Sequence, residues 1–96
     1  NSGENDILPA QFVLKQNYPN PFNPVTKIGY SIDRTSNVSL RLYDVTGGLV
    51  ETLLSNRVQA GSHDYILDAS HLSSGVYFYT MTLNDVSETK KLILMK

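Results

Sequence analysis

The sequence contains no cysteine among its 96 residues, which excludes a disulfide scaffold, a thiolate zinc site and a cysteine nucleophile. An excess of one charge is also missing, because eight basic and nine acidic side chains leave a formal net charge of −1. Without an overall positive field, we expect no nucleic-acid partner and no generic attraction to an anionic membrane. Tryptophan is absent too, and no apolar run approaches the roughly 18–20 residues of a membrane span.

What is present is enough for one folded domain. Hydrophobic residues make up 41% of the chain and charged residues 18%, a balance that favours a packed core over intrinsic disorder. Residues 1–7 are small and polar at their start, which is typical of a linker from an upstream domain, and residues 8–96 are expected to form the domain itself. The polar start does not resemble a signal peptide, so any export signal is expected to have been removed or to lie elsewhere.

The prolines are concentrated near the start of the chain. All four lie in the first quarter of the sequence, and three belong to the run Asn17-Tyr18-Pro19-Asn20-Pro21-Phe22-Asn23-Pro24. Proline lacks the backbone donor and pushes the preceding residue into extended geometry, so this run cannot be a helix or a central strand. We predict an ordered extended loop, held in place by burial of Tyr18 and Phe22.

Beyond residue 25 the apolar residues recur with a period of two, as in strands with one face on a core. Thr46-Gly47-Gly48 and Asn84-Asp85 supply residues that tight hairpin turns need. The segment from Ala69 to Gly75 is too short and polar for a stable helix and predicts a turn. About seven short strands result, and the fold class predicted is all-β, an immunoglobulin-like antiparallel β-sandwich.

The last strand-like segment ends in Leu92-Ile93-Leu94-Met95-Lys96. Its apolar residues predict that the chain end is part of the core, although chain termini are usually frayed. An edge strand exposes backbone groups that another chain can pair with, so this segment is also a candidate handle for a partner.

The sequence offers candidate residues for three kinds of site: a catalytic triad, a calcium site and a carbohydrate-binding face. A serine-histidine-acid triad needs a buried acid and an oxyanion hole, which crowding along one segment does not show; the candidates are His63, Asp64, Asp68, His71, Ser73 and Ser74. The simpler interpretation is that Asp68, Ser70 and Ser73 hydrogen-bond the backbone of a turn, and that His63 and His71 are solvated loop residues. Asparagine and aspartate oxygens suggest a calcium site, but asparagines in such a loop more often cap their own backbone; the candidates are Asn17, Asn20, Asn23, Asp64 and Asp68. We expect no catalytic residue, metal or other cofactor.

A carbohydrate-binding face is the third alternative. The chain has six tyrosines, and Tyr77 and Tyr79 share one face of a strand, where planar rings can stack on sugars. A sandwich without tryptophan needs large side chains inside, so packing is the simpler role for most of these aromatics, namely Tyr30, Tyr43, Tyr77 and Phe78. No small-molecule substrate is expected.

Several motifs together resemble a known family. They cover about residues 8–96 and are Phe12 to Pro24, Thr26 to Tyr30, Val38 with Leu42-Tyr43-Asp44 and Gly47, Ala60-Gly61 with His63, Leu72 to Tyr79, and Lys90-Lys91-Leu92. In this order they are similar to the C-terminal sorting domain, type A, of substrates of the type IX (Por) secretion system in Bacteroidetes and related phyla. The proline run is the most specific of them. The chain departs from a common family pattern in lacking a tryptophan near Ile66.

The resemblance implies a role in protein traffic. A cargo joined upstream would cross the periplasm, be selected by the type IX translocon and shuttle components, and reach the cell surface or the medium. A sortase-like cysteine protease would remove the domain or attach the cargo to the surface. By residue match, Gly75, Tyr77, Lys91 and Lys96 are the candidate recognition residues. The alternatives are a non-catalytic accessory module of a secreted enzyme, as a carbohydrate binder or spacer, and an assembly scaffold like flagellar hook-capping proteins.

Overall fold

The computed structural model describes residues 11–96, and the linker expected over residues 1–7 lies outside this range. Within the described range the elements are strands, and there is no helix long and apolar enough to cross a membrane. In chain order the strands are β1 (Phe12–Leu14), β2 (Val25–Ile32), β3 (Ser36–Tyr43), β4 (Leu49–Val58), β5 (Gly61–Asp68), β6 (Gly75–Leu83) and β7 (Val86–Leu94).

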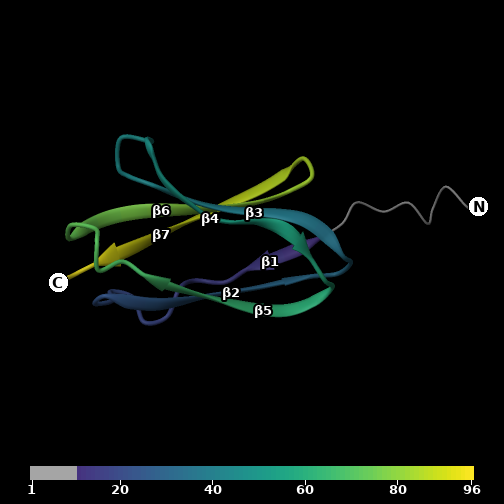
Figure 1. Ribbon diagram of the computed structural model, residues 1–96, viewed down its shortest axis with the longest axis horizontal. Helices are drawn as coiled ribbons and strands as arrows, with labels where there is room; N and C mark the ends of the chain where they lie inside the picture. Colours follow the sequence, from purple (N-terminus) through teal and green to yellow (C-terminus); the bar gives the residue numbers. More distant parts are fainter. Residues whose placement is uncertain (1–10) are drawn as a thin grey trace, which may run out of the picture.

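The strands form two antiparallel sheets that lie face to face (Figure 1). One sheet has three strands in the order β1-β2-β5, and the other has four in the order β4-β3-β6-β7. The chain changes sheet between β2 and β3, between β4 and β5, and between β5 and β6, as expected for an immunoglobulin-like sandwich. The predicted fold class is therefore confirmed.

The core lies between the sheets because each strand alternates inward apolar and outward polar side chains. In β3, for example, Val38, Leu40 and Leu42 are buried, while the residues between them are more exposed. The predicted period of two thus separates core from surface. The buried cluster comprises Leu14, Phe22, Ile28, Tyr30, Ile32, Val38, Leu40, Leu42, Val58, Leu67, Ala69, Tyr77, Tyr79, Met81, Leu83, Leu92 and Leu94.

The turn between β3 and β4 explains the Tyr-Asp-x-x-Gly motif. Asp44 Oδ1 accepts hydrogen bonds from the backbone N–H groups of Thr46 and Gly48, each at 2.9 Å, and from the Thr46 hydroxyl at 2.6 Å. The Thr46 hydroxyl, followed by the Gly48 N–H, lowers the pKa of the Asp44 carboxyl. Gly47 has a φ of +87°, which a side chain disfavours. Both predicted hairpins form, the second at Asn84 between β6 and β7.

The four-stranded sheet has β4 at one edge and β7 at the other. The pairing of β4 with β3 shifts twice, between Leu40 and Arg41 and between Leu42 and Tyr43. These shifts are β-bulges in the edge strand, which disturb the regular spacing of backbone groups that a further strand would need. The pairing of β7 with β6 has no such shift from Val86 to Leu94.

Candidate functional site

The last strand, β7, belongs both to the core and to the sheet edge. Leu92 and Leu94 are each 1% exposed, and they point inward against the second sheet. Between and beside them, Lys91 and Ile93 point outward, as the alternation of a strand requires. The prediction that the chain end contributes to the core is confirmed.

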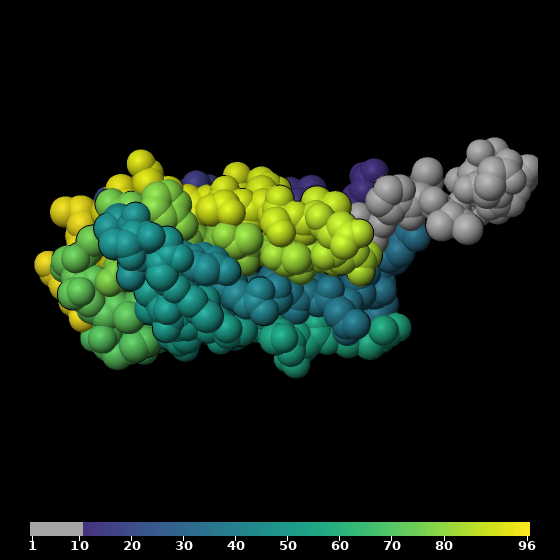
Figure 2. Space-filling view, turned by 90° about the horizontal axis from the view of Figure 1, so that it is seen from above, coloured from purple at the N-terminus to yellow at the C-terminus, as the bar shows by residue number. Residues whose placement is uncertain are grey.

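The proline loop, residues 15–24, lies along the outer edge of β7. The backbone N–H of Phe22 donates to the carbonyl oxygen of Ile93 at 3.0 Å, and the N–H of Met95 donates to the carbonyl oxygen of Phe22 at 2.9 Å. These two bonds form a parallel bridge between Phe22 and Leu94. In Figure 2, purple residues of this N-terminal part emerge beside the yellow strand β7. The loop therefore pairs with β7 as a short additional strand.

Two side chains of the proline loop extend this contact. Asn20 Oδ1 accepts a hydrogen bond from the Ile93 N–H at 3.0 Å, and Gln16 Nε2 donates to the Lys91 carbonyl oxygen at 2.6 Å. The loop thus reaches backbone groups of residues 91, 93 and 95, which face the same edge because backbone groups alternate along a strand.

The uncovered part of this edge is short. The backbone groups of Ser87 and Thr89 face the same outer edge as those of Lys91, because backbone groups alternate along a strand. Within residues 11–96 no hydrogen bond reaches them from that edge. The hypothesis that the final strand offers a free edge to a partner thus applies only to its first half. In the second half, the chain covers its own edge.

Asn17 anchors the start of the loop and is 2% exposed. Its backbone N–H donates to Tyr79 Oη at 2.8 Å, and its side-chain Nδ2 donates to Thr26 Oγ1 at 3.0 Å and to the Pro19 carbonyl oxygen at 3.1 Å. The Tyr79 hydroxyl donates in turn to the Lys15 carbonyl oxygen at 2.7 Å. Burial raises the pKa of Tyr79 to about 12, so its hydroxyl keeps the proton that it donates.

Of the two aromatic residues of the proline loop, both predicted to be buried, only one is. Phe22 is 3% exposed and belongs to the core, whereas Tyr18 is 77% exposed, so the predicted burial of Tyr18 is wrong. Tyr18 instead contributes through its backbone, whose N–H and C=O pair with Lys27 at 2.9 and 3.0 Å. Because Asn17 points inward in this extended segment, its neighbour must point outward.

Gly75 and Tyr77 form a corner where the chain enters β6. Tyr77 is 8% exposed, and its hydroxyl donates to the Ser73 carbonyl oxygen at 2.7 Å. This bond, from the start of a strand back to a residue a few positions upstream, is the tyrosine corner of immunoglobulin-like sandwiches. Gly75 has a φ of +153°, and the space beside it is open, so backbone conformation is what requires glycine there. Both residues shape this end of the domain.

The basic residues of the chain end have different surroundings. Lys91 is exposed and makes no ion pair among the described residues. Lys96 Nζ donates to the Ser70 carbonyl oxygen at 2.7 Å, and the Lys96 backbone N–H donates to Ser74 Oγ at 3.0 Å. Since Gly75 pairs with Leu94 across the sheet, the structure brings Gly75, Tyr77, Lys91 and Lys96 to one end of the sandwich.

The candidate triad residues are not assembled for catalysis in the described chain. The His63 ring stacks on Tyr30 with centroids 5.5 Å apart, and its Nε2 lies 2.7 Å from the Gln59 carbonyl oxygen. His71 Nε2 lies 3.1 Å from Glu51 Oε1. Neither histidine contacts a serine hydroxyl, so the serine-histidine pair that a triad needs is missing from residues 11–96.

The remaining triad candidates hold the turn between β5 and β6. Asp68 Oδ1 accepts hydrogen bonds from the Ser70 hydroxyl at 2.5 Å and the Ser70 backbone N–H at 3.0 Å. The Ser70 hydroxyl, followed by that N–H, lowers the pKa of the Asp68 carboxyl. The Ser73 carbonyl oxygen accepts a hydrogen bond from the Tyr77 hydroxyl, and Ser74 Oγ accepts one from the Lys96 N–H. Asp64 lies on the outer face of β5. The predicted turn role is confirmed for Asp68 and Ser70. The predicted loop position of His63 is wrong, because His63 lies within β5 and is half-buried against the Tyr30 ring.

No group of three or more His, Asp or Glu residues suited to a metal occurs within residues 11–96. The side-chain oxygen of Asn17 accepts from Gln16 at 2.6 Å, and that of Asn20 accepts from the Ile93 N–H. Neither oxygen caps the backbone of its own loop, so that expectation is wrong for the oxygens of Asn17 and Asn20, which bind the Gln16 side chain and the backbone of β7. Asn23 is exposed.

The tyrosine platform considered for carbohydrate stacking does not exist. Tyr79 is 0% exposed and Tyr77 is 8% exposed, because both point into the core from β6. Tyr30 is also buried, so packing is confirmed as its role, while Tyr43 and Phe78 are half-buried on the outer side of the four-stranded sheet. Stacking a sugar on Tyr77 or Tyr79 would require unfolding the domain.

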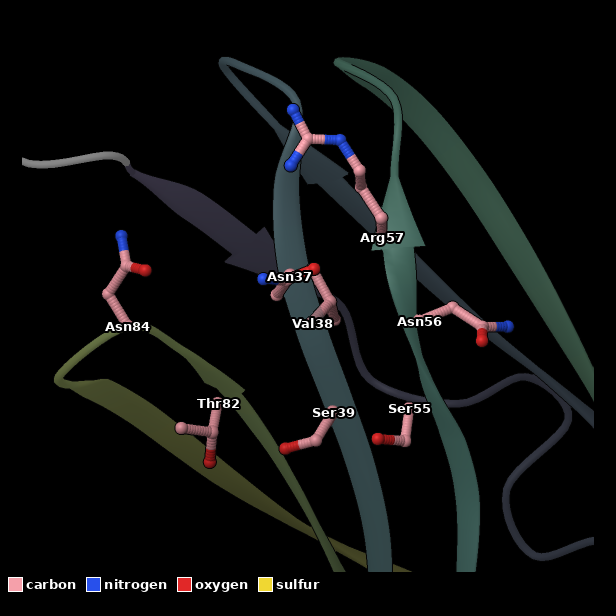
Figure 3. A pocket seen from close by; sticks show the side chains of 8 residues that line it. All are labelled: Asn37, Val38, Ser39, Ser55, Asn56, Arg57, Thr82 and Asn84. Atoms are coloured by element: carbon pink, nitrogen blue, oxygen red, sulfur yellow. The ribbon is translucent and has the colours of Figure 1, made fainter.

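A hollow of about 500 Å³ lies on the outer side of β3, β4 and β6. Figure 3 shows the side chains around it, which include no carboxylate or imidazole; apart from Val38 they carry hydroxyl, amide or guanidinium groups, and they are Asn37, Val38, Ser39, Ser55, Asn56, Arg57, Thr82 and Asn84. Without an acid or a base, these residues do not form a general acid-base site.

The sequence reasoning missed the network around Asn17, although one signal was present. Thr26 occupies an inward position of β2, in the same alternation as Ile28 and Tyr30, and a polar side chain at a core position needs a hydrogen-bond partner. The short polar residues of the neighbouring proline run, of which Asn17 is one, were the nearest candidates.

Comparison with known proteins adds one finding. Residues 16–95 match the model of a family described as the secretion system C-terminal sorting domain. The matched range includes the proline loop from Gln16, the tyrosine corner and the whole of β7. No curated protein sequence matches the chain.

Proposed function

The chain belongs to the family of secretion system C-terminal sorting domains, and on this premise we propose that it directs a folded cargo, joined at its N-terminal side, through the type IX translocon of the outer membrane. One observation supports this most. Three segments carry the family motifs: residues 16–24, 75–79 and 91–96. Hydrogen bonds join the first segment to the third, and the second pairs with the third as neighbouring strands, with Gly75 opposite Leu94. A signal read from a folded protein needs such a fixed arrangement.

The proposed route begins in the periplasm, where the cargo and this domain fold. Shuttle and translocon components then select the domain, and the cargo reaches the cell surface or the medium. A sortase-like cysteine protease cleaves the domain from the cargo or attaches the cargo to the surface. In this scheme the domain binds proteins and performs no catalysis.

The four candidate residues have two kinds of role in the proposal. Lys91 and Lys96 lie on the surface at the chain end and supply positive charge to the partner. Tyr77 is 8% exposed, so Gly75 and Tyr77 act as positioning residues that fix the turn beside Lys96. The resulting surface has a defined shape only in the folded domain.

The test is delivery of a reporter fused to residues 1–96 in a host that carries the type IX machinery. Reversing the charge with Lys91→Glu and Lys96→Glu should abolish surface delivery, while thermal melting should change little, because exposed charges usually alter stability by within about 0.5 kcal/mol. The matched control is Lys27→Glu with Arg34→Glu, two exposed basic residues away from the chain end, and it should be delivered normally.

The result separates recognition from packing. Normal delivery of the Lys91 and Lys96 double variant would mean that these lysines are ordinary solvated residues. Failure of the unmodified fusion to reach the surface would refute the sorting role itself. Deleting residues 92–96 is not a useful variant, because it removes Leu92 and Leu94 from the core.

A further inference from the structure

The outer face of the four-stranded sheet is positively charged, although the whole chain has a net charge of −1. The alternation of burial places odd-numbered residues of β3 and β7 and even-numbered residues of β6 on this face, and none of them is Asp or Glu. Arg41 and Lys91 are among them, and Arg57 pairs with an outward residue of β3. Within residues 11–96 none of the three forms an ion pair.

The outer face of the three-stranded sheet differs, because its charges compensate one another. Lys27 on β2 is flanked across the sheet by Asp64 and Asp68, which pair with the residues two positions to either side of it. Lys15 and Asp64 both lie beside Gly29, within 3.3 Å of the position that a Cβ would take. The uncompensated charge is therefore a property of one face, not of the surface in general.

Aromatic and branched side chains adjoin Arg41 and Lys91 on the outer face of the four-stranded sheet, at the end nearest the C-terminus. Tyr43 pairs with Phe78 across β3 and β6, and Val76 pairs with Ile93 across β6 and β7. All four are half-buried because they cover one another on the outside of the sheet. Lys91 pairs with Phe78, so the cation and the ring are neighbours. Figure 2 looks onto this face, with β7 in yellow beside β6 in green.

We propose that this docking pad, made of Tyr43, Phe78, Val76 and Ile93 with Arg41 and Lys91, receives a protein segment whose apolar side chain is flanked by carboxylates. The proposal rests on the proposed function, and the segment belongs to the export machinery. Aromatic residues and arginine are enriched at the centres of protein interfaces. A face with unpaired cations and no Asp or Glu at the outward positions of β3, β6 and β7 is complementary to acidic side chains.

A protein fits the pad better than an anionic polysaccharide does. Val76 and Ile93 offer branched aliphatic surface, which packs against an apolar side chain and has nothing to donate to sugar hydroxyls. The hydroxyl and amide groups that would suit a saccharide gather instead in the hollow of Figure 3, toward Asn84 at the opposite end of β6. The acidic partner segment therefore binds beside the chain end, where the family motifs meet.

The test uses the reporter fusion with changes on the two outer faces. Arg41→Glu should lower surface delivery by about tenfold or more, the factor that corresponds to 1.4 kcal/mol of binding. Lys27→Glu makes the same charge change on a strand of the opposite face and should leave delivery within about twofold, a difference below that factor. Phe78→Thr keeps a residue that favours strands and should also lower delivery. Arg41→Lys should restore most of it.

Thermal melting of each variant shows whether the domain is still folded, and Arg41→Gln replaces Arg41→Glu if the latter is not. Normal delivery of folded Arg41 and Phe78 variants would overturn the pad while leaving the sorting role intact. If the unmodified fusion is not delivered, the sorting role fails and the pad proposal with it. Retention of the domain on immobilised polygalacturonate, lost in Arg41→Glu while delivery stays normal, would assign the face to an anionic polysaccharide and overturn the proposal.

Discussion

The two edges of the four-stranded sheet, β4 and β7, are protected in different ways. Two bulges interrupt β4, so its own sequence makes it a poor template for another strand. β7 pairs regularly with β6, and its second half is covered by the proline loop instead. One edge is protected locally and the other by a segment far away in the sequence. Changes to the loop residues that contact β7 or the core should therefore have larger effects than changes on β4.

Truncating Phe22 should have the largest effect. Phe22→Ala removes a buried ring and the side chain that holds the loop against β7, and should lower the free energy of unfolding by about 3–5 kcal/mol. Urea denaturation measures this change. Tyr18→Ala is the matched control in the same loop and should cost within about 0.5 kcal/mol, because its ring lies in solvent. Equal effects of the two substitutions would contradict the anchoring role of Phe22.

Removing the side chain of Asn17 should have the next largest effect. Asn17→Ala leaves the buried hydroxyl of Thr26 and the carbonyl oxygen of Pro19 with one partner fewer, and should cost about 1–3 kcal/mol. The comparison is Asn23→Ala, an exposed asparagine of the same loop, measured in the same denaturation experiment. A cost for Asn23→Ala as large as that for Asn17→Ala would show that the network is not the anchor.

The pH dependence of stability should report on Tyr79. Its pKa is raised to about 12 in the folded state, so its contribution is fully present below the unfolded value near pH 10 and is lost as the pH rises from there to about 12. Unfolding curves between pH 9 and pH 12 should therefore lose stability more steeply in the unmodified domain than in Tyr79→Phe. Identical slopes for the two proteins would argue against a buried, hydrogen-bonded hydroxyl.

The smallest expected effects compare the two edges directly. Asn20→Ala removes the acceptor for the Ile93 N–H and should cost about 1 kcal/mol, the typical net value of one hydrogen bond. Ser55→Ala on the outward side of β4 should stay within about 0.5 kcal/mol. Light scattering provides a second readout, because an exposed edge promotes association, and only the Asn20 variant should associate more than the unmodified domain. The reverse order would mean that β4 is the vulnerable edge.

The parts of the fold that depend on neighbouring residues could be predicted from the sequence. Gly47 and Gly48 identify one hairpin and Asn84 the other, because tight turns need residues that accept a positive φ. The alternation of apolar residues likewise shows which side of each strand meets the core. The bulges of β4 could not be predicted, because their positions are set by how β3 and β4 twist against each other.

The candidate site was harder to predict because it joins distant segments. The family motifs identify the proline run and the chain end separately, but no local pattern indicates that Asn20 bonds to Ile93 across 73 residues. The same limit explains the wrong assignment of Tyr18. Both aromatic side chains of the loop are apolar enough to be expected in the core. Tyr18 faces solvent because its neighbour Asn17 takes the inward position, which the sequence alone does not indicate.

The cover of β7 also sets an order of events during synthesis. The proline loop leaves the ribosome early, yet its partners Ile93 and Met95 are among the last residues of this domain to be made. Until they emerge, Phe22 has no strand to bridge, and the loop cannot take its final position. A chain that lacks these residues therefore cannot form the contact between the proline loop and β7. The cover of this sheet edge is completed only after the last strand has been made.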